Sequence, residues 1–390
     1  MRKKMKYLKS DFDERNLAKR EDLQDYIEFR AANDKWIHPF CNECTVSGIG
    51  IAGMVEKAVS QAAGFSIPDS DVEESQEQEA RLTNKLLLVF PEDFSFKAMS
   101  IRYTAFRDVL NRSGFEKSST LEREVSKEKK GAMPPLLKGI IMSLGLSLNQ
   151  EECNLLIRDE KVSAMKSAQY RIFRDKDVVE KLESYLTEEF PEFTYAGGHV
   201  NHEYLLFDYM LNATDQEESF RMMLEDLGVD ADKLGTFKIG VQVSTSDVGN
   251  SSITFSPFYI MNGVKAFLAE PLKVPHLVSK DVYDIEECFP KIAAAIKESE
   301  DDIETLGNTP IHFPKKCVEG LVDELKLPKT ESKDVQFDSD CTAMDVYFAL
   351  FDVIQKAYAN TGSLSALINN SERIAKLLKN VNRITVYDKE

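Results

Sequence analysis

Three side chains near the beginning of the chain have the types and the spacing of zinc ligands. His38, Cys41 and Cys44 follow one another at intervals of three residues, and such a cysteine pair suits a tight loop around Zn²⁺. A structural zinc site needs four ligands, and no second CxxC pair and no HxxxH pair is present further along the sequence. We therefore expect Cys41 and Cys44 to be ordinary thiols near a short loop.

A second group, His199, His202 and Glu203, comes after a Gly-Gly pair and has the residue types of a metal or acid/base site. In a strand, positions 199 and 202 face opposite sides, and the order HxxHE differs from the HExxH signature of helical zinc sites. The sequence contains no Walker A motif and no GxSxG nucleophile elbow. We expect no cofactor and no catalytic residue. An enzyme with a metal at these three residues stays open as an alternative.

Basic and aromatic side chains alternate in the middle of the chain. Residues 158–176 hold six basic and three acidic residues, a local charge of +3 in a chain of net charge −17. Such side chains can neutralise phosphates and stack on the bases of a single strand. The alternative is a surface element whose aromatic residues belong to the core. The candidate nucleic-acid-binding residues are Lys161, Lys166, Tyr170, Arg171, Phe173 and Arg174.

The elements that must position these residues indicate an α+β fold, with a central, mostly antiparallel sheet, flanking helices and a helical C-terminal third. Hydrophobic alternation predicts strands at 236–244 and 252–261, and Asn262-Gly263 predicts a tight turn after the second strand. Pro257 places the second of these strands at an edge or a bulge. Residues 45–67 are expected to form a buried helix, and RITVY near the end a last strand. Helices are predicted at 176–190, 285–300, 316–326, 343–359 and 363–380.

Composition sets the class of protein. The 390 residues are 43% hydrophobic and 29% charged, which is typical of a globular chain, and no run of 18 uncharged apolar residues is present. We expect a charged arm, a helical segment and an acidic linker in residues 1–80, and the main α+β domain in residues 81–390. Six scattered cysteines and a basic start without an apolar h-region predict a cytoplasmic protein without a membrane partner.

Four segments resemble, in their order, a family of unknown function that phages and plasmids carry. They are SIRYTAFRDVLNRSGF (100–115), KVSAMKSAQYRIFRDKDVVEKLE (161–183), VSTSDVGNSSITFSPFYIMNG (243–263) and CTAMDVYFALFDVI (341–354). Family members commonly have a Cys before the Asn-Gly, where this chain has Ile260 and Met261. Ser246, Asp247 and Gly249 match the central motif, which we interpret as a tight turn or, alternatively, a binding loop. The resemblance implies a mobile-element origin and assigns no catalytic residues.

The first hypothesis for the function is a non-enzymatic phage protein that binds single-stranded nucleic acid or assists DNA replication or recombination. A virion or assembly component is the first alternative, and a counter-defence protein that sequesters a host factor is a further one. The expected partners are single-stranded DNA or a phage or host protein, and we expect a homo-oligomer. The net charge of −17 opposes non-specific coating of DNA.

Overall fold

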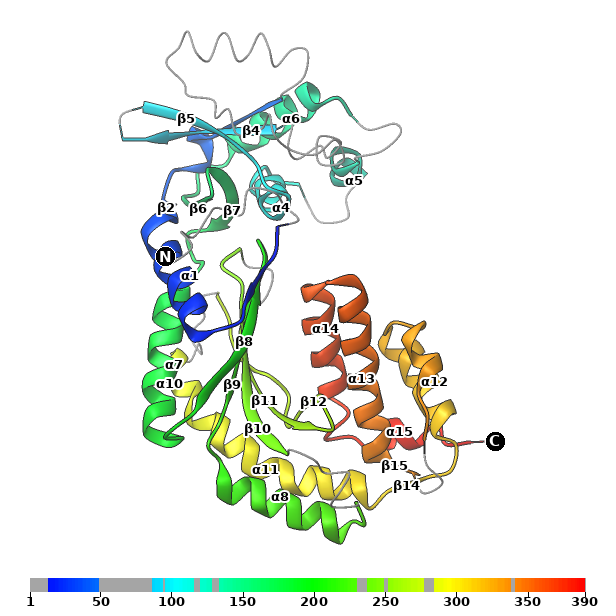
Figure 1. Cartoon of the computed structure of the whole chain (residues 1–390). Helices are drawn as coiled ribbons and strands as arrows, with labels where there is room; N and C mark the ends of the chain where they lie inside the picture. Colours follow the sequence, from blue (N-terminus) through cyan, green and yellow to red (C-terminus); the bar gives the residue numbers. More distant parts are fainter. Residues whose placement is uncertain are drawn as a thin grey trace.

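The fold is α+β, and the chain is divided between two hydrophobic cores. The computed structural model describes residues 13–48, 86–93, 95–115, 120–127, 133–229, 237–248, 252–276, 284–337 and 341–389. One core joins buried residues between Cys41 and Met165, and the other joins residues 17–27 with residues 178–384. We call residues 35–167 the smaller unit, and residues 13–34 with 168–389 the larger unit. Figure 1 shows the smaller unit beyond one end of the large sheet.

The larger unit is built on one antiparallel sheet, in the order β1-β8-β9-β10-β11-β12, with β13 pairing to β11. Its strands are β1 (Arg15–Leu17), β8 (Thr194–Val200), β9 (Leu205–Met210), β10 (Lys238–Thr245), β11 (Ile253–Met261), β12 (Val264–Phe267) and β13 (Leu272–Val274). Alternating apolar residues form β10 as predicted, and Ile239, Val241 and Val243 are fully buried. Asn262 and Gly263 have φ of 51° and 78°, which gives the predicted tight turn before β12.

Helices pack around this sheet. The first to cover it are α1 (Arg20–Asn33), α7 (Asp175–Glu189), α8 (Thr214–Asp226), α10 (Ile285–Cys288) and α11 (Pro290–Gly307). The C-terminal helices are α12 (Pro314–Leu325), α13 (Ala343–Thr361), α14 (Leu364–Ala375) and α15 (Asn382–Thr385), with the short pair β14 (Pro310–Ile311) and β15 (Cys341–Thr342) and the turn η4 (Glu331–Asp334). In Figure 1, α13 and α14 stand on the opposite side of the sheet from α7 and α10. The C-terminal third is therefore helical, as predicted.

In its described residues, the smaller unit has two three-stranded antiparallel sheets and three helices. One sheet has the order β2-β6-β7 and the other β3-β4-β5. The strands are β2 (Lys35–Ile37), β3 (Thr45–Gly48), β4 (Leu86–Glu92), β5 (Ser95–Ser100), β6 (Cys153–Arg158) and β7 (Lys161–Ser167). A 3-10 turn, η1 (Cys41–Glu43), lies before β3, and the helices are α4 (Tyr103–Arg112), α5 (Thr120–Ser126) and α6 (Pro135–Leu148).

Several expectations differ from this structure. The predicted boundary near residue 80 lies outside the described residues, whereas β3 and β4 on its two sides are hydrogen-bonded to one another. Residues 45–48 form a strand rather than the start of a helix, and 49–67 are not described. Pro257 lies in an interior strand, at the gap between the β13 and β12 pairings. The predicted last strand is replaced by α15, because Ile384 is buried as part of a helix.

Among the described residues, no helix combines the length and the apolar character that crossing a membrane requires.

Candidate functional site

A network of buried ion pairs joins the two units. Arg30 of α1 donates two hydrogen bonds, of 2.9 and 3.1 Å, to the carboxylate of Asp159, which lies in the turn between β6 and β7. Arg158 pairs with Asp34 at 2.5 Å and with Asp247 at 2.6 Å. The side chains of all five residues are at most 11% exposed. Breaking one buried pair leaves an uncompensated charge, so this network fixes the two units relative to one another.

Asp247 is a carboxyl group of the network with a strongly raised pKa. Burial and the neighbouring charge of Asp175 raise the pKa of Asp247 to about 8. Burial also raises the pKa of Asp175, although Thr245 Oγ1 donates a hydrogen bond of 2.5 Å to it. Asp34, Asp175 and Asp247 thus lie around the single guanidinium of Arg158. A proton on Asp247 at neutral pH relieves the repulsion between these carboxylates.

Beside the network, three aromatic rings lie one above another. Trp36 and Tyr170 have ring centroids 6.0 Å apart, and Tyr170 and His276 have centroids 4.7 Å apart with nearly parallel planes. We call Trp36, Tyr170 and His276 the ring stack. The Tyr170 hydroxyl donates to the backbone oxygens of Ser246 and Asp247, at 3.4 and 3.1 Å. The ring stack therefore joins β2, the segment after β7, the segment after β10 and the segment after β13.

His276 leaves one hydrogen-bonding atom without a partner. Its Nδ1 lies 3.0 Å from the backbone oxygen of Arg171 and donates to it, so that Nε2 carries a lone pair. Among the described residues, Nε2 has no hydrogen-bond partner, although His276 is only 6% exposed. Burial lowers the pKa of His276, which keeps the imidazole neutral and Nε2 an acceptor at neutral pH.

A cavity lies on each side of the ring stack. The cavity at His276 has a volume of about 360 Å³ and includes Asn111, Arg112, Lys166, Ser167 and Tyr170 in its wall. The cavity at Trp36 has a volume of about 350 Å³ and includes Arg30, His38, Arg174, Asp175 and Asp247 in its wall. Both volumes fall in the range of small-molecule sites, and both walls carry hydrogen-bonding groups of each polarity. These cavities are the candidate binding site.

The predicted basic and aromatic residues are distributed over this region in three different environments. Lys161 is 3% exposed, and Tyr170 is 8% exposed inside the ring stack. Lys166 pairs with Asp108 at 2.7 Å, and the half-exposed Arg171 pairs with Asp284 at 3.0 Å. Phe173 lies edge-on to His276 and beneath the Arg171 guanidinium, and Arg174 is exposed. Arg171, Phe173 and Arg174 are thus the members that an incoming ligand can reach.

The cysteines of the candidate zinc motif are buried, and a third cysteine joins them. The thiol of Cys153 lies beside those of Cys41 and Cys44, and the thiols of Cys44 and Cys153 donate to backbone oxygens. A hydrogen bond with Cys153 and burial raise the pKa of the Cys41 thiol. His38 donates instead to Asn154 Oδ1 at 2.6 Å. Within the described ranges, no group of three His, Cys, Asp or Glu residues is arranged to hold a metal ion.

The second histidine group is separated in space. His202 is 4% exposed and its Nε2 lies 3.0 Å from an Arg102 guanidinium nitrogen, across the junction of the two units. His199 lies edge-on to Tyr358 of α13 instead. The backbone nitrogen of Glu203 donates to Asn201 Oδ1. These three residues therefore do not converge on one metal or acid/base position.

The turn motif contributes to the candidate site. Ser246 is buried, the Asp247 side chain is 10% exposed, and the backbone oxygens of both accept from Tyr170, while Gly249 lies outside the described residues. The carboxylate of Asp247 pairs with Arg158 and lines the cavity at Trp36. The motif thus meets the 158–176 segment, which lies far from it in the sequence.

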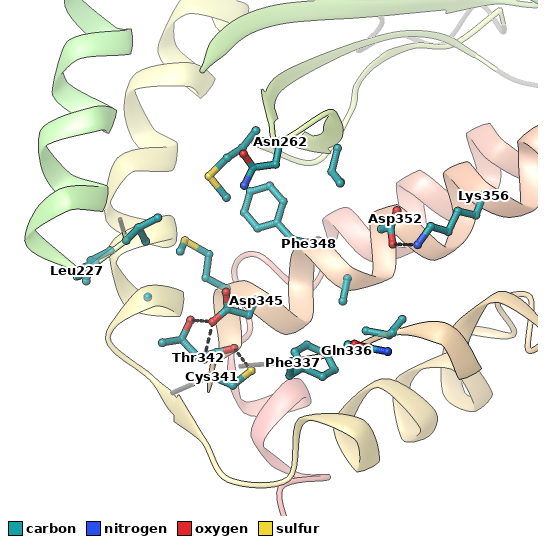
Figure 2. A pocket seen from close by; sticks show the side chains of 18 residues that line it. Leu227, Asn262, Gln336, Phe337, Cys341, Thr342, Asp345, Phe348, Asp352 and Lys356 are labelled. Carbon is teal, nitrogen blue, oxygen red and sulfur yellow. Dashed lines mark hydrogen bonds and ion pairs between the residues drawn. The ribbon is translucent and has the colours of Figure 1, made fainter. Parts of the chain in front are cut away.

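A third cavity, of about 580 Å³, lies at the other end of the larger unit and has a different character (Figure 2). Phe337 and Phe348 contribute apolar wall, and Asp352 is paired with Lys356 at 2.6 Å. The Asp345 carboxylate accepts from the Thr342 nitrogen and hydroxyl. Burial raises the pKa of the Cys341 thiol to about 12, which leaves it unreactive at neutral pH. The polar groups named here therefore have partners within the fold, so this cavity is a weaker candidate for a binding site.

The comparisons with known proteins found no matching family model, no matching curated protein and no matching solved structure. The function of the site must therefore be inferred from its own residues. Trp36 and His276 are the members that sequence reasoning missed. Trp36 is the one tryptophan of the chain, which is the signal that could have pointed to it, whereas no local pattern marks His276.

Proposed function

We propose that the protein is a non-enzymatic protein that binds single-stranded nucleic acid along the outside of the ring stack. The observation that carries this proposal is the position of two cations beside the two cavities: Arg174 lines the cavity at Trp36, and the Arg171 guanidinium lies over Phe173, whose ring is edge-on to His276. Single-strand sites combine cations that follow the backbone with aromatic faces that receive bases, and this edge has both.

The cations at this edge are available to phosphate at small cost. The ion pair of Arg171 with Asp284 is exposed on both sides, and such surface pairs contribute about 1 kcal/mol or less. Replacement of the Asp284 carboxylate by a phosphate as the partner of Arg171 therefore costs little free energy. Arg174 is exposed at the start of α7, whose N-terminal dipole also favours an anion.

The cavity at His276 contains a hydrogen-bond acceptor that can bind a nucleobase. Nε2 of His276 is a buried acceptor in its wall, and the exocyclic amino groups of nucleobases are donors. Asn111 offers a donor on the same wall, which suits an acceptor atom of a base edge. An unstacked base can present these atoms, whereas a base within a duplex cannot.

The overall charge favours a single strand over a duplex. A chain of net charge −17 is repelled by the dense charge of double-stranded DNA, so that binding must rest on local cations. Protonation of Asp247 at neutral pH removes one negative charge from the cavity at Trp36. The resemblance of residues 243–263 to a phage- and plasmid-borne family is our reason to place this binding in the DNA metabolism of a mobile element.

The test is fluorescence anisotropy with labelled single- and double-stranded DNA at about 50 and about 200 mM salt, where phosphate contacts show their salt dependence. We expect salt-sensitive binding that favours the single strand. The double variant Arg171→Ala/Arg174→Ala should bind more weakly, and the slope of log K against log salt should fall by about 1.4 for two lost single-strand contacts.

A matched control removes two charges elsewhere. Lys329→Ala/Arg383→Ala replaces two basic residues of the C-terminal helical region, each of which forms an exposed ion pair. Its binding should equal that of the unmodified protein. Absence of binding at both salt concentrations, or equal slopes in the two double variants, would refute the proposal.

A further inference from the structure

Helix α6 is apolar on all of its sides. Its only charged residue is Lys138, which is fully buried and donates from Nζ to the backbone oxygens of Val125 and Lys127. The inner side packs on β3, where a Cβ at Gly139 would lie 2.9 Å from the Val46 oxygen. Met142 and Leu146 complete this inner side and are fully buried in the core of the smaller unit. The inner side thus accounts for half of the helix.

The outer side of α6 is a continuous aliphatic stripe. Its members follow one another at helical spacing, so that they lie on one face over a length of about 18 Å. They are exposed by 42, 44, 56, 64 and 78%, in the order Leu136, Leu137, Ile140, Leu144 and Leu148. We call these five residues the α6 stripe.

A helix with this composition is expected to be covered. Surface helices carry polar and charged residues on the side that faces solvent, and helices that are apolar all round are buried. The exposed fractions of the α6 stripe add up to nearly three complete aliphatic residues. Single exposed aliphatic residues are common, but contiguous patches on soluble proteins mark an interaction surface.

We propose that the α6 stripe is the centre of a homodimer interface, in which it packs against the α6 stripe of a second copy of this chain. An interface about a twofold axis brings the same patch of both subunits together, so that the patch must complement itself. An uncharged aliphatic stripe does so. The net charge of −17 makes most other surfaces of two copies repel one another, whereas no charged group of α6 faces outward.

Nucleic acid suits the stripe less well than a second copy of the chain. Nucleic acid needs cations or aromatic faces, which the stripe lacks, so the dimer surface is independent of the proposed function. A stable dimer buries about 800 Å² on each partner. The stripe supplies apolar residues for the centre of such an area, and the exposed Ser147 is a polar residue on the same face.

The test is the molar mass of the full chain in solution, measured by light scattering and by sedimentation equilibrium over a wide range of concentrations. We expect a species of twice the 44.2 kDa chain mass. Leu144→Glu should raise the dimer dissociation constant by about a hundredfold or more, because each dimer would bury two carboxylates. Met222→Glu is the matched control, since Met222 of α8 is 58% exposed and lies in the larger unit. This variant should remain dimeric.

Circular dichroism separates loss of the dimer from loss of the fold. If Leu144→Glu does not fold, Leu148→Asp replaces it, because Leu148 is the last residue of α6 and is 78% exposed. A monomer at all concentrations, or a dimer that persists in these variants, overturns the proposal. Binding of the monomer to phosphatidylcholine vesicles would assign the stripe to a lipid surface instead. If the unmodified protein is a monomer and Leu144→Glu lowers its free energy of unfolding, another part of the same chain covers the stripe.

Discussion

Replacement of Asp247 by asparagine tests the buried network directly. Asparagine has nearly the same shape, and its side-chain oxygen can still accept from Arg158, which lies 2.6 Å from the carboxylate. The variant removes one titrating group from a site where Asp34 and Asp175 repel a second or third negative charge. The fold should therefore persist, and the pH dependence of its stability should change.

The sign depends on which state binds the proton. An aspartate in the unfolded chain has a pKa of about 3.9, whereas burial and Asp175 raise the pKa of Asp247 in the folded protein to about 8. Between these values the folded state holds a proton that the unfolded state has lost. The contribution of Asp247 to the free energy of unfolding is thus complete below about pH 4 and is lost as the pH rises to about 8.

The size of the effect follows from one proton, which only the folded state holds between about pH 4 and about pH 8. A shift of one pKa unit corresponds to about 1.4 kcal/mol, so two pH units inside the window correspond to about 2.7 kcal/mol. Between about pH 5 and about pH 7, the free energy of unfolding of the unmodified protein should fall by this amount relative to Asp247→Asn.

Urea unfolding at several pH values measures the difference. Trp36 lines the same cavity as Asp247, and its fluorescence reports the junction, while circular dichroism reports the whole chain. Asp177→Asn is the control, since it removes an exposed carboxylate from the first turn of α7. Parallel stability curves for Asp247→Asn and the unmodified protein would refute the reasoning, as would a variant that loses more stability than the unmodified protein as the pH rises.

Three further outcomes are expected. Thr342→Ala removes the cap of α13 and should lower the free energy of unfolding by about 1 kcal/mol in urea titrations, with an unchanged m-value. Gly240→Ala should cost more, about 2 kcal/mol, because its Cβ would collide with the Phe258 ring inside the large sheet; a melting temperature equal to that of the unmodified protein would contradict this packing. All six cysteines are buried free thiols, so a disulfide reagent should react slowly with the native protein and fully in urea, and rapid native reaction of Cys41 would show that the smaller unit opens.

Sequence patterns predicted correctly the elements whose conformation depends mainly on neighbouring residues. The alternation around Ile239 and Val241 and the Asn262-Gly263 turn produced β10 and the hairpin after β11, because strand period and turn conformation depend on neighbouring residues. The RITVY segment failed for the opposite reason. Its β-branched residues favour a strand, but its place beside α12, where the Tyr387 ring packs over Gly320, selects a helical turn.

The candidate site was predictable only in part. The basic and aromatic content of 158–176 located the junction, but composition could not separate buried Lys161 and Tyr170 from exposed Arg174. The ring stack depends on Trp36 and His276, which lie at opposite sides of that segment in the sequence and meet only through the fold. Pairings of this kind leave no periodic signal in one sequence.

The smaller unit is inserted into the larger one, and this arrangement sets an order of events during synthesis. Strand β1 emerges first from the ribosome, yet its partner is β8, with Arg15 opposite Val200. The core of the smaller unit lies between them and is continuous in the chain, so it can complete its packing while β1 and α1 still lack theirs. The β6–β7 turn carries Asp159, whose carboxylate accepts from Arg30 of α1 in the folded protein. This ion pair is therefore a contact that α1 can make with residues synthesised before β8, whereas the pairing of β1 has to wait for β8.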